Sequence, residues 1–165
     1  MRRFLTILLL ICFLIAASLT AWLYLKLNTR VGDIPKELQT NTSFKICNEK
    51  KILQYYGIGT TYEGGKRAIK HALENQLPKD LRFENSGYLV FRFVVNCKGE
   101  SGRFQVKMTN KELQPTDFDQ EKVQQILQHL RKLKNWEPGM RNQVAYDSYC
   151  QLTVKVEEGI ITDIF

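Results

Sequence analysis

Residues 88–97 have the sequence YLVFRFVVNC, from which the rest of the fold can be predicted. Its side chains alternate between two faces that are both rather apolar, as in a strand that has neighbours on both sides. The turn-forming run KGESG follows at 98–102, and Phe104, Val106 and Met108 then alternate along a second stretch. The two stretches therefore predict an antiparallel hairpin.

Apolar residues recur at helical spacing on both sides of this hairpin. Before it, Gly64 and Gly65 open a pattern that ends at Pro78, because a helix interior cannot accommodate proline. After it, apolar residues at 123–133 follow the i, i+3, i+4, i+7 spacing of an amphipathic helix. Two residues can cap this second helix: Asp117 and Asp119.

A last strand is predicted at 149–156, and a short terminal strand at 160–165 follows the turn-forming residues Glu158 and Gly159. The order helix, strand, strand, helix, strand indicates an α+β domain that contains a small antiparallel sheet. Because crossover connections are right-handed, we expect the last strand to lie beyond the first strand, at the far edge of the sheet.

The N-terminus is apolar enough to form a membrane anchor. Residues 4–25 carry no charge and are flanked by Arg2, Arg3 and Lys26, and about 20 apolar residues cross a hydrocarbon core of about 30 Å. A cleaved signal peptide is the alternative, but the apolar run continues beyond its small residues at 16–18. We therefore divide the chain into an anchor at 1–28, a connecting region at 29–59 and a domain at 60–165.

Composition restricts the class of protein. The 165 residues include 24 Lys+Arg and 17 Asp+Glu, which give a net charge of +7, and 44% of the residues are hydrophobic. This length excludes a barrel or doubly wound enzyme, and the apolar content excludes a disordered chain. The basic residues are dispersed, which argues against nucleic-acid binding. His71 and His129 have no partner at metal-ligand spacing, so we expect neither a catalytic residue nor a metal or cofactor site.

Three cysteines follow the apolar segment. If the last strand lies antiparallel beside the first, Cys97 at the end of one faces Cys150 at the start of the other, and we expect these two to form a disulfide. Cys47 would then carry a free thiol. In the competing arrangement, Cys47 pairs with Cys97 or Cys150 and fastens the connecting region to the sheet.

Three motifs in a fixed order lead to a family resemblance. They are YEGG at 62–65, the strand at 87–95 with KG at 98–99, and WEPG at 136–139. Over residues 60–158 the chain resembles the C-terminal domain of the TonB family of energy transducers, whose N-terminal anchor it shares. The resemblance implies a single-pass inner-membrane protein with its domain in the periplasm. It also implies an α+β fold in which two helices cover one face of an antiparallel sheet of three or four strands. Its motif residues are Gly64, Gly65, Trp136, Pro138 and Gly139.

The family binds its partner by strand addition, and the unpaired backbone of an edge strand is suited to that. The resemblance implies a periplasmic or outer-membrane protein partner, such as a TonB-dependent receptor, and inner-membrane motor proteins. The apolar segment lacks the histidine of motor-coupled anchors, however, and no proline-rich segment follows it. A tethered interaction module without energy transduction is therefore the alternative. The residues expected to bind the partner are Tyr146, Tyr149, Gln151, Thr153 and Lys155.

Overall fold

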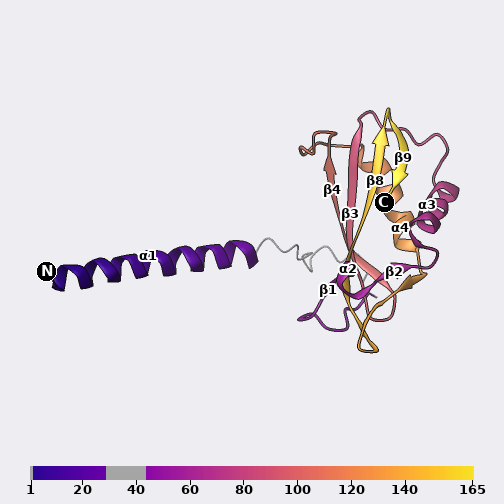
Figure 1. The fold of residues 1–165 in the computed structure, drawn as a ribbon. Helices are drawn as coiled ribbons and strands as arrows, with labels where there is room; N and C mark the ends of the chain where they lie inside the picture. The colour runs from indigo at the N-terminus through magenta and orange to yellow at the C-terminus, as the bar shows by residue number, and fades with distance from the viewer. Residues whose placement is uncertain (1, 29–43) are drawn as a thin grey trace. The chain divides into compact units, whose positions relative to one another are not determined.

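A computed structural model describes residues 2–28 and 44–165, which fall into two units (Figure 1). The first unit contains helix α1 (Arg2–Asn28), whose segment Arg2–Tyr24 has a mean hydropathy of 2.6. This helix is long and apolar enough to cross a membrane, as the sequence predicts. The second unit contains every other described element.

The second unit is built on a five-stranded sheet (Figure 1). The strand order is β4, β3, β8, and both β1 and β9 then pair with β8. All pairs are antiparallel except the short β1–β8 pair, which is parallel. The strands have these bounds: β1 (Leu53–Gln54), β3 (Gly87–Val95), β4 (Ser101–Thr109), β8 (Ser148–Glu157) and β9 (Ile160–Ile164).

Helices α3 (Gly65–Gln76) and α4 (Gln120–Lys132) pack against one face of this sheet, as predicted. Asp119 caps α4, because its side chain accepts hydrogen bonds from the backbone N–H groups of Glu121 and Lys122. The core between the helices and the sheet has these fully buried members: Leu73, Leu89, Phe91, Phe93, Val95, Val123, Ile126, Leu130, Leu152, Val154 and Val156.

The predicted position of the last strand at the edge of the sheet is wrong. Strand β8 does lie beside β3, but its other side pairs with β1 near Tyr149 and with β9 from Val154 onward. The sheet therefore has five strands rather than three or four. The Glu158–Gly159 turn brings β9 back onto β8. Strand β1 is only two residues long, which is too short to be predicted from an alternating sequence pattern.

Four further short strands and one helical turn complete the domain. They are α2 (Tyr55–Ile58), the antiparallel pair β2 (Thr61–Tyr62) and β5 (Trp136–Glu137), and the hairpin β6 (Gly139–Arg141) and β7 (Val144–Tyr146). Phe44 and Ile58 are buried, so residues 44–59 belong to the folded domain, which begins earlier than position 60.

Candidate functional site

A disulfide closes the corner where the chain enters the domain. Cys47 bonds to Cys97, with a Cα–Cα distance of 6.1 Å, so the predicted Cys97–Cys150 pair is wrong and the competing arrangement is present. The register explains the error. Cys150 lies opposite Phe93, four residues before Cys97, and four residues of strand span about 13 Å.

Cys150 has a free, buried thiol. Burial raises the pKa of this thiol from 9.0 to about 12, and the nearby Ser148 hydroxyl, 3.8 Å from the sulfur, offsets only part of that effect. A thiol in this state is a poor nucleophile, so Cys150 is a core residue and not a reactive one.

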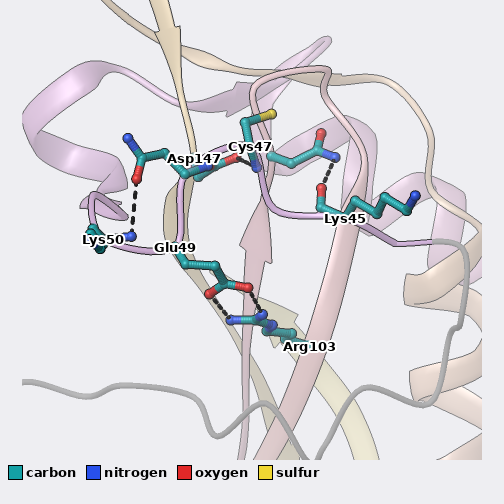
Figure 2. Close-up of polar contacts among 8 residues, drawn as sticks. Lys45, Cys47, Glu49, Lys50, Arg103 and Asp147 are labelled. Atoms are coloured by element: carbon teal, nitrogen blue, oxygen red, sulfur yellow. Dashed lines mark hydrogen bonds and ion pairs between the residues drawn. The ribbon is translucent and has the colours of Figure 1, made fainter.

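The buried carboxylate of Asp147 organises the same corner (Figure 2). Its Oδ1 accepts hydrogen bonds from the backbone N–H groups of Cys47 (3.1 Å) and Cys97 (3.0 Å). Its Oδ2 accepts one from the N–H of Asn48 (2.6 Å). The carboxylate therefore joins the two cysteine segments independently of the disulfide, and no motif around Asp147 in the sequence indicates this.

An ion pair also fastens the segment that follows Cys47 to the sheet. The guanidinium of Arg103, which is buried, donates two hydrogen bonds to the carboxylate of Glu49 (Figure 2). Arg103 has a φ of 53° and lies in the part of β4 where the register with β3 shifts. Asn96 adds a further link, because its Nδ2 donates to the carbonyl of Lys45 at 2.9 Å. Residues 45–49 are thus held to the sheet by side chains.

The five predicted partner-binding residues lie in different environments. Gln151 is exposed on β8, whereas Tyr149 and Thr153 are buried. Tyr146 lies on β7, not on β8, and its ring contacts the Lys51 ammonium at 4.6 Å. Lys155 forms an ion pair with Glu157 at 2.9 Å. The structure thus does not bring the five side chains together on one accessible edge.

The outer side of β8 nevertheless has a gap in its pairing. The ladder with β1 ends at Tyr149, and pairing resumes at Thr153, which exchanges backbone hydrogen bonds with Phe165 (2.7 and 2.9 Å). Backbone groups alternate in direction along a strand, so the N–H and C=O of Gln151 point to the same side as those of Thr153. Neither β1 nor β9 extends to Gln151. One donor and one acceptor of β8 therefore face the gap.

A small cavity of about 70 Å³ adjoins this gap. It includes Trp136, whose ring packs edge-to-face on Tyr62 (centroids 5.1 Å apart) and on Phe93 (5.0 Å). The backbone N–H and C=O of Gln151 that face the gap therefore lie beside a cavity whose wall contains the rings of Tyr62 and Trp136. The cavity is lined by Tyr55, Thr60, Thr61, Tyr62, Gly65, Lys66, Ile69, Trp136, Cys150, Gln151 and Leu152.

The motif residues have structural roles, and two of them, Gly65 and Trp136, line this cavity. Gly64 and Gly65 both adopt left-handed φ values, 78° and 68°, which allow the chain to turn sharply into α3. Gly139 lies so close to Ile58 that a Cβ would come within 2.3 Å of its side chain. Pro138 is half-buried between β5 and β6, and Trp136 is half-buried against the core.

The candidate metal-ligating and imidazole groups among the described residues have other partners. Cys47, Cys97 and Asp147 are the candidate ligand group in the described part of the chain, but the sulfurs form the disulfide and the carboxylate accepts three N–H groups. Imidazole nitrogens of His71 and His129 contact Glu74 at 3.7 Å and Gln76 at 3.1 Å, respectively.

Comparisons with known proteins give no relative: no family model matches the chain, and neither a curated protein nor a solved structure is significantly similar to it.

Proposed function

We propose that this protein is a membrane-anchored, TonB-like binding domain that takes up an extended segment of a protein partner by strand addition at the outer side of β8. The free N–H and C=O of Gln151, beside the aromatic cavity, carry this proposal. An extended segment pairs with such groups and places alternate side chains in neighbouring pockets. A single free residue gives a short docking point, so a longer segment would displace β9.

Strand β9 is suited to such an exchange. It is five residues long, and Ile160, Thr162 and Asp163 are exposed, whereas Ile164 is buried. Its outer side is held mainly by Lys70, which donates to the carbonyl of Thr162 (3.4 Å) and to Asp163 (3.3 Å). A partner segment that replaced β9 would regain the backbone hydrogen bonds of β8 and would also cover Gln151.

Helix α1 and the disulfide support a placement at a membrane, with the domain on its oxidising side. Helix α1 is long and apolar enough to span a bilayer, and disulfides persist mainly outside the reducing cytoplasm. We therefore propose the inner membrane and the periplasm, with an outer-membrane or periplasmic partner such as a TonB-dependent receptor. An alkaline phosphatase fusion after Lys36 should be active and membrane-bound; activity found only in the soluble fraction would favour a cleaved signal peptide.

A tethered interaction module without energy transduction is the second candidate function. It is favoured by the described part of α1, in which Thr6 and Thr20 donate hydrogen bonds to carbonyls of their own helix. The sequence from Phe4 to Tyr24 contains no Asp, Glu, Lys, Arg or His. Motor coupling through an intramembrane charge would need such a group, unless inner-membrane motor proteins provide it.

The test uses proline to remove a single donor. Gln151→Pro deletes the N–H that faces the gap and leaves the groups that pair with β3, whereas Gln151→Ala keeps the N–H and removes only the side chain. A photo-crosslinking residue at Tyr55, which is exposed and lines the cavity with Gln151, would capture the partner of the full chain in intact cells. We expect Gln151→Pro to abolish the crosslinked band and Gln151→Ala to keep it. A band of equal intensity in both variants would rule out strand addition at this edge.

A further inference from the structure

A cleft of about 510 Å³ lies on another part of the domain, where the chain enters it. Its wall has an apolar part, Phe44 and Leu133, and a basic part, Lys98, Arg131 and Lys134. These residues come from the start of the domain, the β3–β4 turn and the end of α4. None of them lines the cavity beside β8.

Among the described residues, the basic side chains that line this cleft outnumber the acidic ones by three to one. Lys98, Arg131 and Lys134 form no ion pair with any carboxylate among residues 2–28 and 44–165. The one carboxylate in the lining, that of Glu100, accepts a hydrogen bond from Asn96 Nδ2 at 2.7 Å. The guanidinium of Arg131 lies 5.9 Å from the centroid of the Phe104 ring, and this contact limits the rotation of the Arg131 side chain away from the cleft. The described lining therefore carries three cations and one carboxylate, beside the buried side chains of Phe44 and Leu133.

We propose that this cleft binds the phosphate headgroup of an anionic phospholipid in the membrane that holds α1. Lysine and arginine are the side chains that bind phosphate, and the apolar wall suits an amphiphile better than a free phosphate ion. Phe44 lies 16 positions after Asn28, so the covalent chain keeps it within about 55 Å of the end of the helix. This tether gives headgroups a high effective concentration at the cleft. The inference rests on the anchor and is independent of partner binding at β8.

The experiment measures the acetylation rate of single lysines in the full chain, reconstituted in nanodiscs. Nanodiscs of phosphatidylcholine alone are compared with nanodiscs that also contain phosphatidylglycerol. We expect the rates of Lys98 and Lys134 to fall at least about fivefold with the anionic lipid, which corresponds to about 1 kcal/mol per basic residue at an anionic surface. Lys79 and Lys111, exposed lysines that do not line the cleft, serve as internal references and should change less than about twofold.

Two substitutions separate the cleft from general attraction to the bilayer. Arg131→Gln should remove the protection of Lys98 and Lys134, whereas Arg82→Gln, which also removes one arginine charge, should leave it unchanged. Equal loss in both variants would overturn the proposal. The wild-type comparison does not depend on either variant folding, and unchanged rates of Lys98 and Lys134 in it would also overturn the proposal.

Two further arms identify the source of the anion. Inorganic phosphate or a glutamate-rich peptide is added to the full chain in nanodiscs of phosphatidylcholine alone. Protection of Lys98 and Lys134 by phosphate would assign the cleft to a soluble phosphate ligand, and protection by the peptide would assign it to an acidic protein segment. Either result would overturn the lipid assignment. Protection only by the anionic lipid supports it.

Discussion

The buried carboxylate of Asp147 offers a sharp test of what holds the domain together. Asp147→Asn keeps the size of the side chain but replaces one oxygen by an N–H donor. If the remaining oxygen stays with Cys47 and Cys97, the new donor faces the N–H of Asn48, which is 2.6 Å from Oδ2. The variant then loses one charge-assisted hydrogen bond, worth about 1.5–3 kcal/mol, and weakens two others by about 0.5–1 kcal/mol each. We expect the free energy of unfolding to fall by about 2.5–5 kcal/mol.

The measurement is urea unfolding of the full chain in detergent micelles, followed by near-ultraviolet circular dichroism. Asp163→Asn is the matched control, because the Asp163 side chain is 54% exposed and pairs with Lys70 at the surface. It should cost less than about 1 kcal/mol. A loss below about 1 kcal/mol for Asp147→Asn, or a loss equal to that of the control, would refute the assignment of a structural role to this carboxylate.

Three further predictions concern the cysteines and the tryptophan. Peptide mapping without reductant should recover a Cys47–Cys97 peptide and no Cys97–Cys150 peptide. Replacing both Cys47 and Cys97 by serine should lower the free energy of unfolding by about 4 kcal/mol, the value that the loop-entropy model gives for a sequence separation of 50 residues. The buried Cys150 thiol should resist alkylation in the folded protein, and rapid alkylation at pH 8 would contradict its burial. Its pKa is higher in the folded state (about 12) than its ordinary value of 9.0, so its contribution to stability should be lost as the pH rises from about 9 to about 12. Trp136→Ala should lower the free energy of unfolding by about 2–4 kcal/mol, less than for a fully buried tryptophan because the ring is half-buried; a loss under about 1 kcal/mol would make it a surface aromatic instead.

The local elements could be predicted because their signals are local. The charge-free stretch at 4–25 predicts α1, the alternation at 88–95 predicts β3, and the i, i+3, i+4 spacing at 123–133 predicts α4. The cap at Asp119 was one of two open choices, and the choice depends on which aspartate lies one residue before the helix. The arrangement of two helices on one face was expected from the family resemblance and not from these local signals.

The contacts of residues 44–59 could not be read in this way. Strand β1 has only two residues, so its parallel pairing with β8 depends on the rest of the sheet being in place. Glu49 and Arg103 are 54 positions apart, and Cys47 and Asp147 are 100 positions apart. Nothing in the local sequence indicates which distant group each will meet.

The disulfide and the unpaired part of β8 both depend on the register of that strand in the sheet. Apolar alternation and the right-handed crossover rule are enough to predict that an antiparallel strand follows α4 and lies beside β3. The register of that strand, and hence the partner of Cys97, was decided by tertiary packing, since a shift of two or four residues keeps the same side chains in the core. The same packing brings β1 and β9 onto β8 and leaves the backbone N–H and C=O of Gln151 between the two ladders.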